Sequence, residues 1–350
     1  MQLFKIITDL LGSRRARISM PDNKQDNTDH AARDFISQYT ITPLESLCKA
    51  PDNAEFLVMR GIALGDIFGS PYEGSGLYKE DPMTINPFMR KSSNTTDDTV
   101  MSIAICEATR NCREHPDWDD DRIVEEYAVS MRKWAKLFPN KGYGSMFYNW
   151  AVWDMENEKY RSYGNGSAMR SGVIGAMFSD YSDVVRYAVL SAMPTHSHPE
   201  GIKGAVVTAT SVWMALHGYT KDQILDRALL YYPNGFTDKW LTEDYMSPKI
   251  TTEQIQALGY DAMSTICQIS VPEAISNFMC SNSYNECLRK ALFYKSDSDT
   301  LGAISGGIAA AYYKNTDIAN VDVIKELDER LVEDEAILRP YLLGDLDCYN

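Results

Sequence analysis

Two short acidic clusters are the strongest candidates for chemistry in this sequence. The first reads TTDDT over residues 95–99 and the second reads SDSDT over residues 296–300, and each opens an apolar run with helical spacing. Carboxylate and hydroxyl oxygens are ligands that hard cations such as Mg²⁺ prefer, and a shared cation stabilises neighbouring carboxylates that would otherwise repel one another. Helix capping is the alternative, because Asp and Thr are favoured where helices begin. Two near-matching clusters about 200 residues apart favour a metal site, since a helical bundle can bring both helix starts together.

Glycine-rich segments and two single residues are candidates for contacts with a substrate. Two segments are rich in glycine, GYGS over residues 142–145 and GNGSAMRSG over residues 164–172. They could be turns that bring backbone N–H groups close to an anion, or ordinary turns that only connect helices. Neither has the lysine of a Walker motif or the preceding strand of a Rossmann motif. His196, in PTHSHPE, is a substrate contact or a solvated loop histidine. Glu73, in SPYEG, lies on a loop where a mobile carboxylate could act as acid or base.

The elements expected to position these residues are helices. Apolar residues recur with helical spacing in long runs, and alternating apolar and polar runs are scarce. We expect a first helix over residues 56–68, stopped by Gly69 and Pro71, and a second over residues 98–110 with an aspartate as its N-cap. Further helices are predicted over residues 122–138, 182–193, 204–218, 299–313 and 321–334.

The pattern predicts an all-α fold with one large domain. Residues 1–53 differ from the rest of the chain, because a short amphipathic segment leads into a polar, turn-rich stretch that is typical of a linker. We therefore predict an amino-terminal extension over residues 1–53 and one large helical domain over residues 54–350.

Composition and charge exclude several classes of protein. The 350 residues include 34 Lys+Arg and 49 Asp+Glu, for a formal net charge of −15, with 44% hydrophobic residues. This composition is globular, and the acidic excess argues against nucleic-acid binding, which clustered basic residues carry. No apolar run reaches the ~18 residues of a membrane span, and the amino-terminal stretch does not read as a signal peptide. Seven scattered cysteines without a C-x-x-C pair predict free thiols in a reducing cytoplasm and no zinc-thiolate site.

Six segments, taken in chain order, match a known family pattern. They span about 250 residues and read GIALGDIFGSPYEG (61–74), TDDT (96–99), GYGS (142–145), GNGSAMR (164–170), TH (195–196) and SDSDTLGAISGGIAAAYY (296–313). Together they resemble the ADP-ribosylglycohydrolase family, the relatives of dinitrogenase reductase-activating glycohydrolase. The resemblance implies a compact orthogonal helical bundle with two Mg²⁺ ions, or Mn²⁺ in their place, at the base of a cleft. One departure is the bulky pair Ile67 and Phe68, where many relatives carry smaller residues.

The resemblance also implies a role for each matching residue. The metal ligands by position would be Thr96, Asp97, Asp98, Asp297, Asp299 and Thr300. Glu73 would lie on a flexible loop. On chemical grounds the catalytic carboxylates are Glu73, Asp98 and Asp299, because Glu73 or one of the metal-bound aspartates could accept the proton of the attacking water. The residues that hold the distal ribose and the pyrophosphate would be Gly144, Ser145, Asn165, Gly166 and His196.

The implied activity is metal-dependent removal of ADP-ribose from a modified protein. Cleavage at the ribose C1″ atom builds oxocarbenium character, and two cations can orient the ribose hydroxyls and lower the pKa of bound water. Arginine is the expected linkage, and serine-linked or free ADP-ribose derivatives remain alternatives because the motifs do not separate them.

A second function implied by the resemblance is toxin immunity. Some bacterial members look like immunity proteins that neutralise an ADP-ribosyltransferase toxin, with an amino-terminal extension that occludes the toxin's site. Residues 1–53 would be that extension here, and the negative charge would suit a basic partner. The competing interpretation of residues 1–53 is a disordered tail. The two functions are compatible with each other.

Overall fold

The computed structural model shows a bundle of helices. It describes residues 36–37, 43–73, 92–155, 161–233, 265–292, 297–316 and 338–342. Over these ranges the regular structure is helical, and β-structure is limited to the isolated bridges Arg161–His196 and Gly164–Ile266. The all-α prediction is confirmed. Within the same ranges, no helix is long and apolar enough to cross a membrane.

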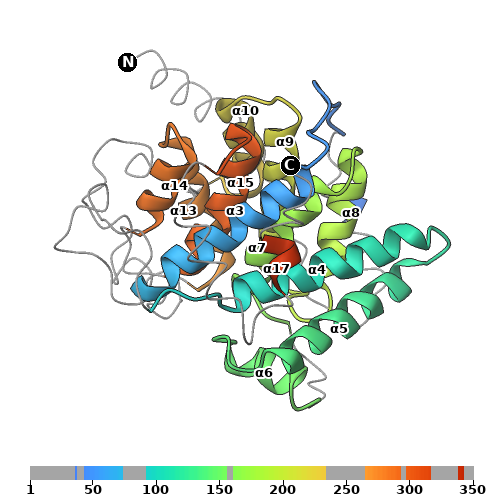
Figure 1. Ribbon diagram of the computed structural model, residues 1–350. Helices are drawn as coiled ribbons and strands as arrows, with labels where there is room; N and C mark the ends of the chain where they lie inside the picture. Colours follow the sequence, from blue (N-terminus) through green and yellow to red (C-terminus); the bar gives the residue numbers. More distant parts are fainter. Residues whose placement is uncertain are drawn as a thin grey trace.

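The bounds of the helices place the acidic segments at helix ends (Figure 1). In chain order the helices are α3 (Ala54–Gly69), η1 (Ser70–Tyr72), α4 (Asp97–Glu114), α5 (Asp120–Leu137), α6 (Ser145–Ala151), α7 (Gly166–Ser171), η3 (Gly172–Ala176), α8 (Tyr181–Ala192), α9 (Pro199–Leu216), α10 (Lys221–Tyr231), α13 (Cys267–Met279), α14 (Tyr284–Ala291), α15 (Ser298–Tyr313) and α17 (Arg339–Leu342). The acidic cluster at residues 95–99 therefore spans the start of α4, and that at 296–300 spans the start of α15.

Helices α3 and α15 pack side by side at the centre of the bundle (Figure 1). Their backbones are in direct contact, since a Cβ atom on Gly65 would lie 2.0 Å from the backbone oxygen of Gly302. A Cβ atom on Gly302 would lie 2.2 Å from the backbone oxygen of Gly65. No side chain fits at either position, so the two glycines set the distance between the helices. Each is close in sequence to an acidic residue, Asp66 on α3 and Asp299 on α15, and the close packing brings these together.

Helices α4 and α5 lie side by side, and α4 packs against the pair formed by α3 and α15 (Figure 1). One face of α5 is buried at helical spacing, with Ile123, Tyr127, Met131 and Trp134 in the core, while Val129 on another face is exposed. This amphipathic pattern is what drives a surface helix onto its neighbours. Asp119 caps α5 by accepting a hydrogen bond from the backbone N–H of Arg122.

Most helices predicted from long apolar runs are confirmed. Helices α3, α5, α8, α9 and α15 occupy the expected segments. The expectation that an aspartate caps the second helix is wrong. Helix α4 begins at Asp97 and its N-cap is Thr96, whose hydroxyl accepts from the backbone N–H of Asp98. The predicted helix over residues 321–334 lies outside the described residues.

The cysteines in the described part of the chain are free thiols, as predicted. They are Cys48, Cys106, Cys112, Cys267, Cys280 and Cys287. Burial raises the pKa of the Cys106, Cys112, Cys267 and Cys287 thiols, which keeps them protonated and disfavours reactivity. Cys348 lies outside the described residues.

The segment that precedes α3 is attached to the turn between α9 and α10. The backbone N–H of Leu47 donates to the carbonyl of His217 at 3.2 Å. The hydroxyl of Tyr219 donates to the carbonyl of Glu45 at 2.7 Å. Residues 43–53 therefore pack on the helical body at the amino-terminal end of α3, whereas Asp66 lies near its other end. Residues 1–35 and 38–42, the larger part of the predicted extension, lie outside the described residues.

Candidate metal centre and substrate cleft

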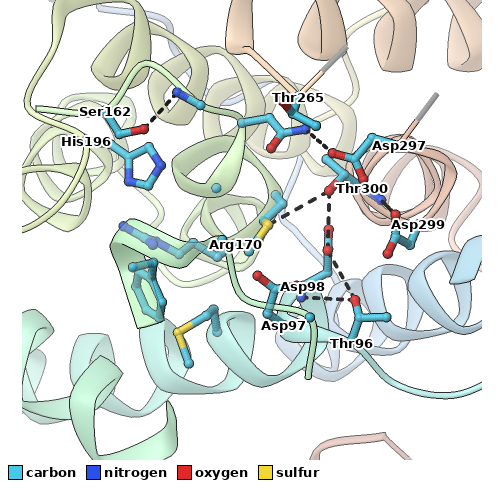
Figure 2. A pocket seen from close by; sticks show the side chains of 18 of the residues that line it. Thr96, Asp97, Asp98, Ser162, Arg170, His196, Thr265, Asp297, Asp299 and Thr300 are labelled. Carbon is cyan, nitrogen blue, oxygen red and sulfur yellow. Dashed lines mark hydrogen bonds between the residues drawn. The ribbon is translucent and has the colours of Figure 1, made fainter. Parts of the chain in front are cut away.

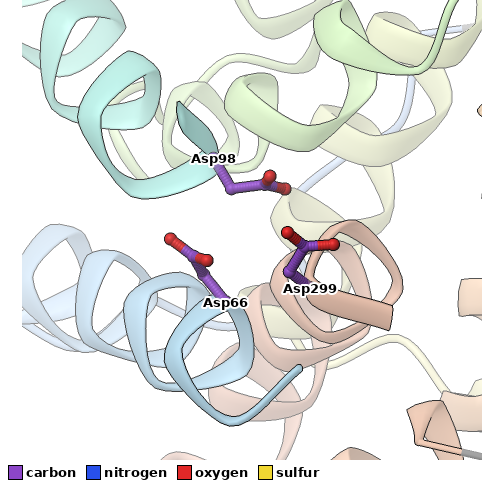
Figure 3. Close-up of side chains that lie close together, drawn as sticks. All are labelled: Asp66, Asp98 and Asp299. Carbon is purple, nitrogen blue, oxygen red and sulfur yellow. The ribbon is translucent and has the colours of Figure 1, made fainter. Parts of the chain in front are cut away.

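Three helix ends converge on one group of carboxylates. Oxygens of Asp66, Asp98 and Asp299, from α3, α4 and α15, lie within 4.8 Å of one another (Figure 3). Oxygens of Glu73, Asp297 and Asp299 form a second triad within the same limit. Asp299 belongs to both triads, so the described residues offer two adjoining positions for a cation.

The two acidic clusters of the sequence are joined directly in the fold. The hydroxyl of Thr300 donates to Oδ2 of Asp98 at 3.3 Å, and the hydroxyl of Thr96 lies at the same distance from that oxygen (Figure 2). The predicted convergence of residues 95–99 and 296–300 is therefore what the structure shows.

Burial and mutual repulsion make this cluster costly without a positive charge. Burial raises the pKa of Asp98 well above its ordinary value, and the neighbouring Asp66 and Asp97 raise it further. The pKa of Asp299 is raised in the same way by burial and by Asp98 and Asp297. Burial and the nearby Asp297 and Asp66 also raise the pKa of Asp97. Buried carboxylates of like charge disfavour each other's ionised form unless a cation compensates them.

One carboxylate oxygen provides an independent test of the fit to a metal. Oδ1 of Asp98 is buried, and it has no hydrogen-bond partner among the residues that the structure describes. Buried polar atoms are normally satisfied, so an oxygen of this kind calls for a ligand. The donors around it are carboxylates and threonine hydroxyls, which are the ligand types of hard divalent cations. The residues present therefore fit a pair of such cations.

Asp66 is a member of the cluster that the sequence interpretation did not assign. Its carboxylate accepts hydrogen bonds from the backbone N–H and the hydroxyl of Thr96, at 2.9 and 2.7 Å, and from both groups of Thr99. These contacts fix the first turn of α4 to the end of α3. Burial raises the pKa of Asp66, and the hydrogen bonds from Thr99 and Thr96 oppose that shift. The sequence signal that could have identified Asp66 is its position as a lone acid inside the apolar run FLVMRGIALGDIF.

A single cleft of about 440 Å³ collects every site residue predicted from the sequence (Figure 2). The predicted ligands and acids that line it are Glu73, Thr96, Asp97, Asp98, Asp297, Asp299 and Thr300. The predicted substrate contacts that line it are Gly144, Ser145, Asn165, Gly166 and His196. Further lining residues that were not predicted include Met101, Phe147, Met169 and Arg170. The acidic side chains thus share one cavity with His196 and with the glycine-rich segment at residues 164–166, which is called the glycine-rich end of the cleft below.

The glycine-rich segments are only partly turns. Gly144 is the N-cap of α6, which begins at Ser145, and residues 166–171 of the second segment form α7. The helical part arises because SAMRS contains helix-compatible residues after the glycine pair. Gly142 has a positive φ of 90°, a conformation that favours glycine, and it lies beside Asp97. The GYGS segment therefore adjoins the carboxylate end of the cleft.

Asn165 connects the glycine-rich end of the cleft to the acidic cluster. Its side-chain amide donates to Oδ2 of Asp297 at 2.7 Å and to the hydroxyl of Ser270 at 3.0 Å. Asn165 was predicted as a substrate contact, and in this structure its amide nitrogen holds a predicted metal ligand. The side chain of Asn165 therefore fixes the carboxylate of Asp297 relative to the segment at residues 164–166.

His196 is a buried cleft residue. It is 5% exposed, which shows that the alternative of a solvated loop histidine is wrong. Burial lowers the pKa of His196 well below its ordinary value, and the guanidinium of Arg170 lowers it further. The imidazole is therefore neutral at neutral pH.

Glu73 lies at the edge of the cluster, immediately after η1. The residue is exposed overall, yet partial burial of its carboxyl raises its pKa, and Asp297 and Asp66 add to the shift. A carboxylate with a raised pKa and access to solvent is suited to exchange protons with water.

Comparison with known proteins identifies the fold and the family. A family model described as ADP-ribosylglycohydrolase matches residues 58–343. The chain belongs to the ADP-ribosylglycohydrolase family. Family membership supports hydrolysis of a glycosidic bond to ADP-ribose as the general class of reaction. The matched range includes all the cleft residues named above. The expected helical bundle is confirmed by a solved structure titled "ADP-ribosylglycohydrolase-related protein complex", which has a TM-score of 0.54 at 18% identity and covers 84% of this chain and 98% of that one.

Several curated proteins are similar to this chain over about two thirds or more of its length. ADP-ribosylhydrolase ARH3 of Gallus gallus is 27% identical over 315 residues, which cover 73% of this chain and 84% of the relative. ADP-ribosylhydrolase ARH3 of Homo sapiens is 26% identical, with the same coverage of both chains. A putative ADP-ribosyl glycohydrolase of Acanthamoeba polyphaga mimivirus is 24% identical and covers 66% of this chain and 74% of its own.

Mg²⁺ is expected to raise the melting temperature of the metal-free protein, and by more at about pH 8 than at about pH 5. The folded-state pKa values of Asp97, Asp98 and Asp299 are raised. The folded protein therefore binds more protons than the unfolded chain between the unfolded and folded pKa values, and metal-free stability falls as pH rises through that interval. A cation reverses this loss, and Mg²⁺ at a hundred times its Kd stabilises by about 2.7 kcal/mol.

Thermal unfolding with excess Mg²⁺ and with EDTA at both pH values measures this effect. Equal melting temperatures in Mg²⁺ and EDTA at about pH 8, or a larger metal effect at about pH 5, would contradict the assignment of these carboxylates to a cation site.

Proposed function

We propose that this protein is a Mg²⁺-dependent hydrolase that removes ADP-ribose from arginine side chains of a modified protein. The observation that carries the proposal is the pair of carboxylate triads that share Asp299, at one end of the cleft that also contains His196. Family membership supplies the general reaction, and the acidic cluster supplies a reason for a metal.

The residues assigned to the metals are the two acidic clusters and their neighbours. In the proposal the ligands are Thr96, Asp97, Asp98, Asp297, Asp299 and Thr300, with Glu73 as a further ligand that can leave. Two bound divalent cations would orient the ribose hydroxyls and compensate the negative charge of the cluster. Mn²⁺ is an expected substitute, since it accepts the same oxygen ligands.

Proton transfer is assigned to Glu73. A water attacks the ribose C1″ atom, the bond to the side-chain nitrogen breaks, and the carboxylate of Glu73 accepts the proton that the water loses. The departing guanidine takes up a proton from solvent and leaves as a guanidinium cation, and Glu73 returns its proton to solvent. Asp98 and Asp299 are assigned an electrostatic role in catalysis. Their negative charge, fixed at the base of the cleft, favours the oxocarbenium-like transition state.

The two glycine-rich segments that line the cleft are assigned to the rest of the ligand. Backbone N–H groups at Gly144, Ser145 and Gly166 can approach the pyrophosphate because no bulky side chain covers them. A Cβ atom on Gly144 would meet nothing within 4 Å, which shows open space on that side. Asn165 and His196 complete this part of the proposed site.

The charge of the metal end supports arginine as the linkage. Six carboxylates lie there, those of Asp66, Glu73, Asp97, Asp98, Asp297 and Asp299. Two divalent cations leave an excess of negative charge if all six are ionised. A guanidinium leaving group is attracted by that excess, whereas the neutral hydroxyl of serine is not.

A comparison of linkages tests the proposal. Proteins ADP-ribosylated on arginine and on serine are incubated separately with the enzyme and Mg²⁺, and release of free ADP-ribose is followed. We expect faster release from arginine. Release from serine alone would keep the hydrolase and overturn the arginine assignment, and no release from either would overturn the hydrolase proposal.

A second function, toxin immunity, is proposed for the segment before α3. The described part of this segment is attached at the amino-terminal end of α3, by Leu47 and by Glu45, and Asp66 lies toward the other end of that helix. The net charge of −15 suits a basic partner. An ADP-ribosyltransferase toxin bound through this segment would therefore not need to enter the cleft, and hydrolysis and occlusion would be independent.

Deletion of residues 1–35 separates the two functions, because it leaves the attached residues 43–53 in place. Occlusion predicts lost binding to a transferase with unchanged hydrolysis. Unchanged binding to the transferase would show that residues 1–35 do not carry it.

A further inference from the structure

Hydrogen bonds through Thr195 connect Arg170 to His196. Arg170 and His196 lie across the cleft from the acidic cluster (Figure 2). Nη2 of Arg170 donates to the hydroxyl of Thr195 at 3.0 Å and to the backbone carbonyl of Ser191 at 3.3 Å. The same hydroxyl lies 2.7 Å from Nδ1 of His196. Arg170 and Thr195 are buried, and Arg170 and His196 both line the cleft.

The hydroxyl of Thr195 decides which nitrogen of His196 carries the proton. A guanidinium only donates hydrogen bonds, so Arg170 occupies a lone pair of the Thr195 oxygen. Among the described residues, Nδ1 of His196 is the one acceptor within hydrogen-bond distance of this hydroxyl. If Nδ1 instead carried a hydrogen and donated it, the buried hydroxyl hydrogen would have no acceptor, which is unfavourable. Nδ1 therefore accepts, and a neutral ring has its hydrogen on Nε2.

The surroundings keep this ring neutral. The buried guanidinium of Arg170 lies close to His196, and a second positive charge on the imidazole would be repelled. A ring held neutral, with Nδ1 used as an acceptor, has one fixed donor, the Nε2–H group.

The Nε2 edge of the ring faces the glycine-rich end of the cleft. A Cβ atom on Gly166 would lie 3.0 Å from Nε2, and one on Gly164 would lie 3.7 Å from it. Because these residues have no side chains, the Nε2 edge can lie against their backbone, where the proposed function places the distal ribose and the pyrophosphate.

We propose that Arg170 and Thr195 are positioning residues that hold His196 as the Nε2–H tautomer, so that it donates a hydrogen bond to an acceptor oxygen of ADP-ribose. The identity of the ligand rests on the proposed function, whereas the tautomer rests on the contacts of Thr195. The donor favours an oxygen acceptor at this position and disfavours a ligand that presents only donors there.

The tautomer can be read directly by NMR. Full-length protein with Mg²⁺ is labelled with ¹⁵N-histidine, and long-range ¹H–¹⁵N spectra are compared with those of His196→Gln, which identifies the His196 signals. Thr195→Val removes the hydroxyl at nearly constant size, and Thr195→Ser retains it as the matched control. We expect the Nε2–H form in the wild type and in Thr195→Ser, and a shift toward the Nδ1–H form in Thr195→Val.

ADP-ribose affinity provides the second readout. Thr195→Val is expected to raise the Kd for ADP-ribose about fivefold to tenfold, the equivalent of about one hydrogen bond, with unchanged affinity for Mg²⁺. A wild-type ring in the Nδ1–H or protonated form, or a Thr195→Val variant with wild-type tautomer and Kd, overturns the proposal. A wild-type ring in the Nε2–H form in a protein that does not bind ADP-ribose upholds the tautomer and overturns the proposed ligand, and with it the donor role.

Discussion

Asp299→Asn is expected to reduce ADP-ribose release about a thousandfold while it raises the melting temperature of the metal-free protein. Asp299 is shared by the two carboxylate triads, so its loss weakens both cation positions at once. Loss of several kcal/mol of metal-based transition-state stabilisation corresponds to that factor. The stability change has the opposite sign, because burial and the neighbouring Asp98 and Asp297 disfavour the charge on Asp299. A neutral amide of the same shape removes this repulsion.

The matched control for this variant is Asp183→Asn. Asp183 is an exposed acid in the first turn of α8, as Asp299 is an acid in the first turn of α15, and it lies outside the cleft. Release rates and melting temperatures measured in Mg²⁺ and in EDTA should be close to wild type for the control. An Asp299→Asn protein that keeps wild-type activity, or that is less stable than wild type in EDTA, would be incompatible with a shared cation ligand.

Gly302→Ala is expected to destabilise the fold by about 3 kcal/mol and to weaken binding of Mg²⁺. The added Cβ atom would lie 2.2 Å from the backbone oxygen of Gly65, and a backbone atom cannot move aside as a flexible side chain can. Overpacking of a core commonly costs about 1–3 kcal/mol. Helices α3 and α15 would have to separate, and the distance between Asp66 and Asp299 would grow with them.

Gly307→Ala in the same helix separates this effect from a general intolerance of α15 to substitution. The atom nearest to its Cβ would be a side-chain atom of Ile62 at 3.0 Å, and alanine favours a helix over glycine by about 1 kcal/mol. Chemical denaturation should therefore place Gly307→Ala within about 1 kcal/mol of wild type. Equal losses of stability in both variants would argue against the backbone contact at Gly302 as the cause.

The long helices and the acidic residues that line the cleft could be predicted from the sequence, because their signals are local. The run GAVVTATSVWMALHG has helical periodicity, and it forms most of α9. The acidic clusters at residues 95–99 and 296–300 are each recognisable within a few residues. Their convergence could be expected because a shared cation would give two similar acidic helix starts in an all-α protein a common physical reason.

Contacts between distant segments could not be predicted in the same way. The carboxylate of Asp66 belongs to the cluster because Gly65 lets α3 approach the backbone of α15, and no local pattern shows which helix it meets. The link from Asn165 to Asp297 and the link from Arg170 to Thr195 also join segments whose pairing only the fold defines. Helices α13 and α14 were missed because α13 contains Pro272 and α14 has only eight residues.

In the proposed function, the acidic cluster holds the divalent cations that hydrolysis of ADP-ribose from protein requires. The most direct measurement is the rate of ADP-ribose release from an arginine-ADP-ribosylated protein, with Mg²⁺, then with EDTA, and again after Mg²⁺ is restored in excess. We predict release with Mg²⁺, loss of release with EDTA, and recovery after restoration. The same rate in EDTA as in Mg²⁺ would contradict the account.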